Sequence, residues 1–403
     1  MNLAGLSASY LRARPLQTAL SLLLLALGVG TIVAALLVVS QIEERMGRDA
    51  RGIDLVVGAK GSPMQLILSG IYHLDAPTGN IPLSEAQALA KHSLVKRAMP
   101  LALGDSWKGY RIVGAGPEYP AHYGAKPAAG RLYEKPMEVV VGAEVAARTG
   151  IGVGARIVGA HGVGGEGEEH EGSPYQVVGV LGRTGSVLDR LVLTPIQSVW
   201  QVHSEHGAAH EAQAGPGEDD DEDREVTVLL VQYASPLAAA LLPRQINSQS
   251  ELQAASPAYE TARLFRIVGA GLEALRAFAA VLILAAGLSV FIALYTALEE
   301  RRYDLAVMRT LGASAGRLFG LLLLEGIALA ALGALLGLVL GHAFASALGI
   351  WMEAAQQPPV TGLTFRTEEL AVLAIALAVG LVAALIPAWR AYRTDVARVL
   401  AQG

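Results

Sequence analysis

The chain contains no cysteine. Disulfide bonds and thiolate-based metal or redox centres are therefore excluded, although the compartment stays open because many periplasmic domains also lack cysteine. Charged residues are scarce as well, at 17% of 403 residues, against about 25% in soluble domains. The net charge of −5 gives no basic excess of the kind that nucleic-acid binding requires. These shortages favour a protein with a large membrane part.

Motifs for nucleotide hydrolysis and zinc proteolysis are also missing. The phosphate-binding pattern G-x-x-x-x-G-K-[ST] is absent, and the chain has no Gly-Lys pair at all. The stretch VVGAKGSP (56–63) has its lysine before the glycine and is typical of a tight turn or a packed loop. No H-E-x-x-H motif occurs either. We therefore expect that this chain is not an enzyme and that any ATPase activity resides in a partner subunit.

Long apolar runs are what the sequence does have. A span requires about 20 residues, and four runs reach roughly that length: 18–39, 277–298, 318–351 and 371–389. Helices in soluble cores rarely run that far without a charge, so four transmembrane helices are predicted. The first run follows Arg12 and Arg14 as a signal peptide would, but it exceeds the 7–15 residues of a signal-peptide core. We expect it to be retained as an anchor.

Lysine and arginine near the ends of the spans predict the orientation. Arginines precede the first span, lie between the second and third, and follow the fourth, at positions 12, 14, 301, 302, 309, 317, 390, 393 and 398. The connection between the third and fourth spans carries Arg366 as its only basic residue. Both termini and the 299–317 loop are therefore predicted to face the cytoplasm, and the segment between the first two spans to lie outside.

That outer segment shows a mixed pattern. Short β-rich runs occur at 54–57, 138–141, 156–159, 176–181, 190–194 and 226–232, separated by glycine and proline. Two short helices are predicted, one over 84–92 capped by Ser84 and one over 142–150 ending at Gly150. Residues 256–276 have helical apolar spacing and run into the second span, so we expect a continuous stalk, with residues 40–50 as its partner.

The predicted fold is thus membrane α-helical, with four transmembrane helices (one plus three) and a large α+β extracytoplasmic domain inserted between helices 1 and 2. The predicted division has three parts. Residues 1–41 form the N-terminal tail and first helix, 42–265 the outer domain with its stalk, and 266–403 the last three helices.

Four stretches resemble a known family, the FtsX/MacB-type permeases of ABC transporters. EERRYDLAVMRTLGAS (299–314) resembles their cytoplasmic loop, usually close to E-R-R-x-E-I-x-x-L-R-x-L-G-A-S, and IPAWRAYRTDVARVL (386–400) resembles their C-terminal end. The stretches 130–157 and 175–195 resemble their MacB-like periplasmic core domain. The order of one span, a large outer domain and three spans is also that of the family.

The resemblance implies that 299–314 is a coupling helix that docks into a groove on a cytoplasmic ABC ATPase. Its apolar side would face the bundle or that groove, and its arginines would lie at lipid headgroups or pair with the partner. The alternative is a solvated, positively charged loop without a partner. The residues assigned to ATPase coupling are Glu300, Arg301, Arg302, Leu305, Met308, Arg309, Leu311 and Gly312.

The implied function is that of a permease subunit in the bacterial inner membrane. ATP hydrolysis by the partner would move the periplasmic domain by mechanotransmission (type VII), for transport or export of a substrate. Implied partners are the ATPase, a second permease as homodimer or heterodimer, a periplasmic binding or fusion protein, and membrane lipids, but no nucleic acid. No cofactor is expected to bind directly. The alternative is a regulator that activates a cell-wall hydrolase without transporting a substrate.

A histidine- and acid-rich loop predicts a metal site. His203, His206 and His210 follow an i, i+3, i+7 spacing, and imidazole and carboxylate together suit divalent metals such as zinc. The loop would bind such a metal weakly, in line with a resemblance to permeases of zinc or siderophore-iron handling. The other interpretation is a solvated loop that binds nothing.

Three further features of the sequence carry expectations. Gly333, Gly337 and Gly341 share one helix face and predict close helix packing, as do Gly28 and Gly30. Glu325 is expected to reach the cytoplasmic headgroups or pair with Arg317, and His342 to stay neutral. The stretch 56–82 is expected to be a long loop that lines the surface between two outer domains, or else an ordinary packed segment.

Overall fold

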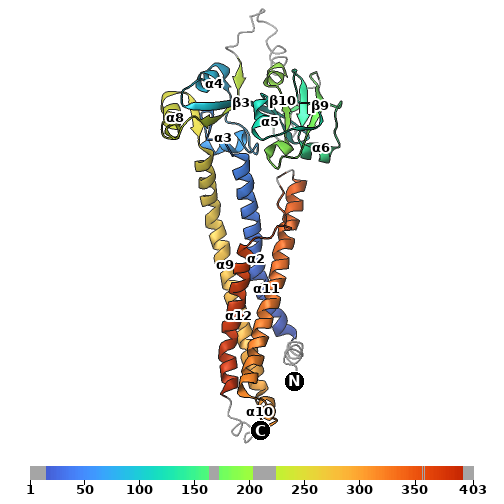
Figure 1. The fold of residues 1–403 in the computed structure, drawn as a ribbon, viewed down its shortest axis with the longest axis vertical. Helices are drawn as coiled ribbons and strands as arrows, with labels where there is room; N and C mark the ends of the chain where they lie inside the picture. Colours follow the sequence, from blue (N-terminus) through green and yellow to red (C-terminus); the bar gives the residue numbers. More distant parts are fainter. Residues whose placement is uncertain (1–14, 163–171, 203–223, 356, 358, 394–403) are drawn as a thin grey trace, which may run out of the picture. The chain divides into compact units, whose positions relative to one another are not determined.

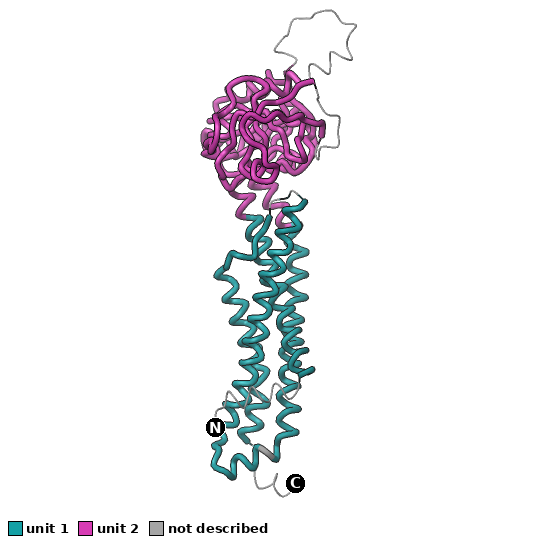
Figure 2. Tube along the Cα trace, turned by 90° about the vertical axis from the view of Figure 1, so that its right-hand side faces the viewer, with its two compact units in different colours: residues 1–43, 267–403 teal, residues 44–266 magenta. Residues whose placement is uncertain are grey.

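The computed structural model describes residues 15–162, 172–202, 224–355, 357 and 359–393. The chain divides into two compact units, coloured separately in Figure 2. One unit, the bundle, is Met1–Glu43 with Ile267–Gly403, and the other, the outer domain, is Glu44–Arg266. Both borders fall inside continuous helices. The predicted borders at 41/42 and 265/266 fall inside the same two helices.

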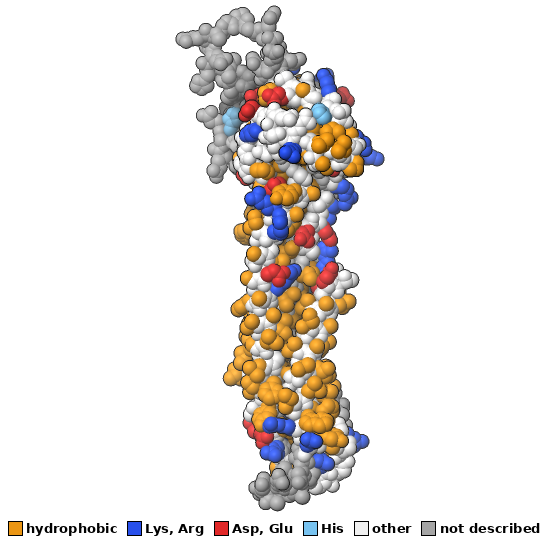
Figure 3. All heavy atoms as spheres, turned by 90° about the vertical axis from the view of Figure 1, so that its left-hand side faces the viewer, with side chains coloured by type: hydrophobic (Ala, Val, Ile, Leu, Met, Phe, Trp, Pro, Cys, Tyr) orange, Lys and Arg blue, Asp and Glu red, His pale blue; other side chains and the backbone are white. Residues whose placement is uncertain are grey.

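Four helices of the described chain are long and apolar enough to span a membrane: α2 (Pro15–Asp49), α9 (Pro257–Glu300), α11 (Ala315–Ala354) and α12 (Glu368–Tyr392). Their order, one before the outer domain and three after it, confirms the predicted fold class. Helix α9 begins at Pro257 without a break before the span, so the predicted continuous stalk helix is also confirmed. On the face drawn in Figure 3, apolar side chains cover the middle of the helices and charged side chains gather toward their ends.

Glycine brings the helices of the bundle together. A Cβ added at Gly337 of α11 would lie 2.7 Å from the Val29 Cβ and 2.8 Å from the Ala26 carbonyl oxygen of α2. Gly333 and Gly341 face Leu25 and Val33 of the same helix. The glycine stripe therefore packs on α2, as its spacing predicts.

Helix α12 packs on α11 by the same means. A Cβ at Gly326 of α11 would lie 2.5 Å from the Ala384 Cβ of α12, and Gly380 of α12 faces Ala330 of α11 in return. Gly28 of α2 faces Ile283 of α9. Glycines thus let the helices approach closely, with larger side chains such as Leu25 and Ile283 packed against them.

One end of the bundle is fastened by polar contacts around the α11–α12 connection. The Gln41 side chain of α2 donates to the Thr361 carbonyl oxygen (2.8 Å) and accepts from its N–H (2.9 Å). His342 lies between two acceptors: its Nδ1 faces the Gly362 carbonyl oxygen and its Nε2 lies 3.0 Å from a carboxylate oxygen of the buried Glu369. Both ring nitrogens donate only in the doubly protonated imidazole. The neutral state expected for His342 stays a prediction.

In the described chain, eleven strands of the outer domain form one sheet. Its main path is β13 (Leu252–Ala255), β1 (Leu55–Ala59), β12 (Val228–Tyr233), β3 (Val95–Trp107), β4 (Tyr110–Ala115), β10 (Val192–Thr194), β6 (Glu138–Val141), β9 (Tyr175–Leu181) and β5 (Pro127–Gly130). Strand β7 (Arg156–Ile157) pairs with β9 and β8 (Ala160–His161) with β3, while β11 (Glu225–Val226) and β2 (Ile81–Pro82) form a separate pair. Neighbours on the path are antiparallel except for β4–β10 and β6–β9.

Helices cover this sheet. Helices α3 (Pro63–Gly70), α4 (Leu83–Ala90) and α8 (Pro236–Gln249) contact the half built from β13, β1, β12 and β3. Helix α6 (Ala143–Thr149) contacts β9 of the other half, and α5 (Glu118–His122) follows β4 (Figure 1).

Both faces of the sheet are buried, because successive residues of a strand point to opposite faces. In β12, Val228 and Leu230 belong to one cluster of buried side chains, and Leu229 and Val231 to another. The first cluster extends along one face from β1 to β9, whereas the opposite face divides into a cluster under α8 and α4 and a cluster at α6. The mixed composition of helices and strands confirms the predicted α+β domain.

The local predictions differ from the structure in two places. Helix α4 begins at Leu83 after Pro82, so Ser84 lies inside the helix and the predicted cap is wrong. Within 56–82, α3 begins at Pro63 after the N-cap Ser62, where a loop was expected. Tyr72 and His73 are buried, so this part of the stretch does not line a surface.

Candidate functional site

A short helix, α10 (Arg302–Thr310), lies between α9 and α11, and turn chemistry sets its bounds. Gly312, two residues beyond its end, adopts a left-handed backbone (φ 98°) that favours glycine. The Ala313 N–H donates to the Met308 carbonyl oxygen (3.0 Å), which closes the end of the helix. Ser314 then caps α11 by accepting from the Arg317 N–H (3.3 Å). Residues 311–314 (LGAS) thus form a tight turn from one helix into the next.

Ser314 also stands at the centre of the pattern G-x-S-x-G, formed by residues 312–316. In hydrolases that pattern places a nucleophilic serine on a turn between a strand and a helix. Here the serine is a helix N-cap between two helices. The match gives no reason to assign catalysis to this position.

Helix α10 has a buried and an exposed side. Leu305 is 3% exposed and lies in an apolar cluster with Leu298 of α9, Leu318 of α11 and Ala388 of α12. Arg302 and Tyr303 are exposed, and Leu311, just past the helix end, is 82% exposed. The helix is therefore seated on the bundle by one side and presents a mixed basic and apolar surface on the other.

An ion pair joins the start of α10 to α11. The Arg301 guanidinium, at the N-cap of α10, lies 3.7 Å from the Glu325 carboxylate, which is 2% exposed. The expected pairing of Glu325 with Arg317 is therefore replaced by one with Arg301. Arg302 pairs with Glu299 at 3.0 Å on the surface. A cation that compensates a buried carboxylate holds the N-terminal end of α10 in place, since an uncompensated charge there would be costly.

The residues assigned to ATPase coupling thus occupy three environments. Leu305 is buried in the bundle, Arg301, Met308 and Arg309 are half-buried, and Glu300, Arg302, Leu311 and Gly312 are exposed. Met308 packs against the same cluster as Leu305. Contact with a partner is available to the exposed group, whereas Leu305 and Met308 hold the helix. Tyr303, exposed beside Arg302, belongs to the same surface.

A second group of residues fixes the end of α2 in the outer domain. The Asp49 carboxylate accepts from the Val187 N–H (2.9 Å), and the Asp49 carbonyl oxygen accepts from the Tyr123 hydroxyl (2.7 Å). The Tyr72 hydroxyl lies 3.4 Å from the Met46 carbonyl oxygen. These contacts were not predicted, because an Asp, a Tyr and a backbone amide far apart in sequence leave no local pattern.

His73 lies beside this group in a left-handed backbone conformation (φ 54°). Its Nε2 lies 3.0 Å from the Tyr119 hydroxyl. Burial, together with the charges of Arg111 and Arg190, lowers the pKa of His73 to about 3. The imidazole is therefore neutral and serves as a fixed polar link to Tyr119 rather than as a group that titrates near neutral pH.

The predicted metal ligands His203, His206 and His210 lie outside the described residues. Across the part of the chain that the structure describes, no group of three or more histidine, aspartate or glutamate side chains is arranged to hold a metal ion. His161 and Asp105 form a pair at 3.3 Å in the outer domain, and two ligands fall short of a typical zinc site.

Two family models match this sequence. Residues 18–249 match the MacB-like periplasmic core domain, and residues 276–396 match the FtsX-like permease C-terminal region. The first match alone covers more than half of the chain. The chain belongs to the FtsX/MacB-like family of ABC transporter permeases. Membership makes it an inner-membrane permease with a periplasmic domain, and implies a partner ABC ATPase and a dimeric permease assembly.

Comparison with individual proteins adds less. No curated protein sequence matches the chain. Among solved structures, the periplasmic region of MacB from Actinobacillus actinomycetemcomitans is 14% identical, with a TM-score of 0.33. The match covers 54% of this chain and 95% of that one.

Proposed function

We propose that this permease couples ATP hydrolysis by a separate ABC ATPase to movements of its periplasmic domain, and that the movement serves transport of a substrate. Helix α10 is the proposed docking element. The observation that carries the proposal is that α10 has a buried and an exposed side. Leu305 is buried against three membrane helices, while Arg302, Tyr303 and Leu311 are exposed. A force applied to the exposed side would reach α9, α11 and α12 through the buried side.

The proposed orientation puts α10 and both termini in the cytoplasm. It is supported by the arginines at 301, 302, 309, 317, 390 and 393, which lie just beyond one end of the last three spans. A cytoplasmic α10 is required for contact with an ATPase that binds cytoplasmic ATP. ATP hydrolysis itself belongs, in this proposal, to the partner.

The substitution Leu311→Glu tests the docking role. It places a charge on a side chain that is exposed in the permease but would be buried against the ATPase. We expect loss of ATPase co-purification and of permease-dependent ATP hydrolysis, with the permease itself still folded. The matched control is Leu237→Glu, the same change at a 59% exposed leucine of α8 in the outer domain. Full retention of the ATPase by the Leu311→Glu permease would reject α10 as the docking element.

Metal handling is a narrower proposal about the substrate. We propose that His203, His206 and His210 form a weak, fast-exchanging divalent-metal site, supported by their spacing and the acidic residues around them. Zinc titration of the full chain tests it, beside a variant with the three histidines changed to alanine. Equal zinc affinity in the two proteins would leave no role in metal binding for these residues.

A further inference from the structure

Two helices of the bundle continue into the outer domain, and one hydroxyl there contacts both. Tyr72 is buried, and its hydroxyl lies 3.4 Å from the Met46 carbonyl oxygen of α2 and 3.2 Å from the Thr261 Oγ1 of α9. A phenolic hydroxyl can donate one hydrogen bond while it accepts another. Tyr72 can therefore donate to the α2 carbonyl and accept from the α9 threonine at the same time.

The chain beyond Tyr72 leads back to α2 by a second route. His73 bonds the Tyr119 hydroxyl, and the Tyr119 ring meets the Tyr123 ring edge-on, with centroids 5.5 Å apart. The Tyr123 hydroxyl donates to the Asp49 carbonyl oxygen at 2.7 Å. Residues 72 and 73 thus connect α9, the α5 helix that carries Tyr119, and two successive turns of α2.

The backbone at this place is strained. A φ of 54° is uncommon for any residue but glycine, although histidine adopts it more often than most, and the surrounding contacts help to hold it. Here the enforcing contacts are the bonds of Tyr72 on one side and the bond of His73 to Tyr119 on the other. A displacement of α9 relative to α2 would act on this segment, since it is bonded to both helices.

We propose that Tyr72 is a positioning residue that joins α2 to α9 within the outer domain and passes their displacement, through His73, to α5. The inference rests on the proposed function, because it assigns the joint by which ATPase-driven movement enters the periplasmic domain. Removal of the Tyr72 hydroxyl leaves the packing of its ring intact. The link between α2 and α9 can therefore be tested without loss of the fold.

The experiment measures hydrogen exchange in the permease–ATPase complex, with and without a non-hydrolysable ATP analogue. The variant is Tyr72→Phe, and the matched control is Tyr133→Phe. Tyr133 is also buried, and its hydroxyl donates to the Ala115 carbonyl oxygen (2.9 Å) within the outer domain. The readout is the nucleotide-dependent difference in exchange of peptides covering 44–52 and 115–125.

We expect the nucleotide analogue to change the hydrogen exchange of these peptides clearly in the unsubstituted complex and in Tyr133→Phe. In Tyr72→Phe most of this change in exchange should be lost. ATPase co-purification and ATP hydrolysis should be unchanged in all three. Thr261→Val should cause the same loss, because it removes the bond from Tyr72 to α9. Combining it with Tyr72→Phe should add nothing, because Tyr72→Phe already removes that bond. If the Tyr72 hydroxyl contributes to stability alone, both tyrosine variants should unfold at a lower temperature, and both should keep the nucleotide-dependent difference in hydrogen exchange.

Two negative outcomes are distinguishable. A full nucleotide-dependent difference in Tyr72→Phe overturns this inference and leaves the proposed function standing. Absence of any difference in the unsubstituted complex overturns the proposed movement of the outer domain and the joint with it.

Discussion

Where the bundle helices meet, glycine and alanine lie at many of the contacts beside larger side chains, whereas the outer-domain sheet is covered on both faces mainly by leucine, valine, isoleucine and tyrosine. The central cluster of the bundle combines five alanines with larger residues of α2, α9 and α12: Ala286, Ala330, Ala334, Ala345 and Ala376 beside Leu25, Val29, Val33, Leu37, Ile283 and Val372. The largest cluster of the outer domain instead includes Leu66, Leu101, Tyr119 and Leu230, each 0% exposed.

The difference follows from the two solvents. In lipid, burial of an apolar side chain gains little, because hydrocarbon surrounds it in either state, so helices associate through close contact of their backbones. In water, removal of large apolar side chains from solvent is the main stabilising contribution. The two units should therefore respond in opposite ways to changes in side-chain volume.

The largest expected effect is from cavity formation in the outer domain. Leu230 lies in β12, opposite Met99 of β3 and Val56 of β1. Leu230→Ala should lower the free energy of unfolding of the outer domain by about 3 kcal/mol, from lost burial and an unfilled cavity. Pulse proteolysis in urea measures this. Leu237→Ala, at an exposed position of α8, is the control, and an equal effect of the two would contradict the assigned core.

The next effect comes from added volume in the bundle. Gly337→Ala puts a methyl group against Val29 and the Ala26 carbonyl oxygen and should destabilise the bundle by about 1–3 kcal/mol. Gly320, on the same helix, has no atom within 4 Å of an added Cβ. Gly320→Ala should therefore stabilise the helix by up to about 1 kcal/mol. Helicity during SDS titration reports both changes, and effects of the same sign would reject the packing described.

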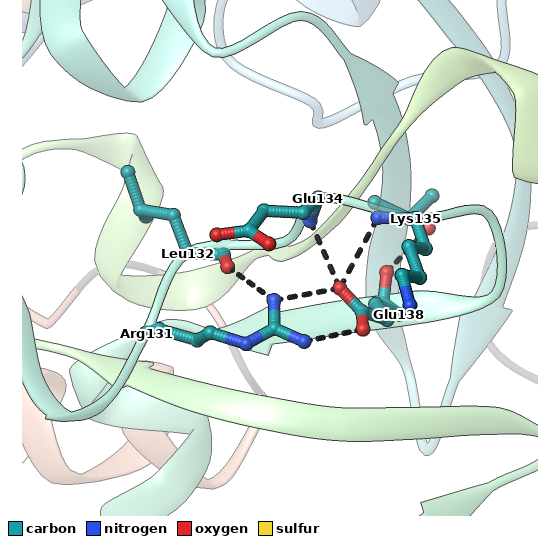
Figure 4. A network of polar contacts seen from close by, with 6 residues as sticks. Arg131, Leu132, Glu134, Lys135 and Glu138 are labelled. Atoms are coloured by element: carbon teal, nitrogen blue, oxygen red, sulfur yellow. Dashed lines mark hydrogen bonds and ion pairs between the residues drawn. The ribbon is translucent and has the colours of Figure 1, made fainter.

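The smallest effect concerns a surface network between β5 and β6, drawn in Figure 4. The Glu138 carboxylate binds the Arg131 guanidinium at 2.5 Å and 2.8 Å, and accepts from the Glu134 and Lys135 N–H groups at 2.9 Å and 3.2 Å. The Arg131 hydrogen bonds, aided by these amides, lower the pKa of Glu138 from 4.5 to about 2.

A folded-state pKa below the unfolded one means that the network stabilises the outer domain above about pH 4.5 and that this contribution is lost as the pH falls toward 2. Glu138→Gln should therefore unfold at a lower temperature than the unsubstituted protein at neutral pH. This difference in unfolding temperature should become smaller in acid. Glu134→Gln is the control, since the backbone N–H of Glu134 donates to Glu138, whereas its carboxylate acts on Arg131 through charge. Thermal unfolding at pH 7 and pH 3 measures this difference in unfolding temperature. A difference that does not change with pH would exclude the ion pair as its source.

Features with a local cause could be predicted from the sequence. The length of the apolar runs predicts the four spans, the Gly333–Gly337–Gly341 spacing predicts the face that packs, and Gly150 predicts the end of α6, where it adopts φ 69°. The start of α3 could also have been predicted from the sequence, because Ser62 and Pro63 form an N-cap and first-turn pair. It was missed because the apolar residues after it are too few for a clear helical period.

Features with a distant cause could not be predicted. Tyr72 bonds residues 26 and 189 positions away in the sequence, and nothing near Tyr72 signals either partner. The same holds for Glu325, which pairs with Arg301 across a helix–helix turn although Arg317 is nearer in sequence. The apolar side of α10 was expected to face either the bundle or the ATPase. Only the fold divides it between Leu305, buried in the bundle, and Leu311, exposed.

That division provides the most direct test of the central claim, that the exposed side of α10 binds the ATPase. A photo-reactive amino acid is placed at position 311 or at position 305, and the permease is irradiated in complex with its ATPase. We predict a cross-link to the ATPase from position 311, and from position 305 only cross-links within the permease, because Leu305 is 3% exposed and Leu311 is 82% exposed. A cross-link to the ATPase from position 305, or none from position 311, would contradict the account.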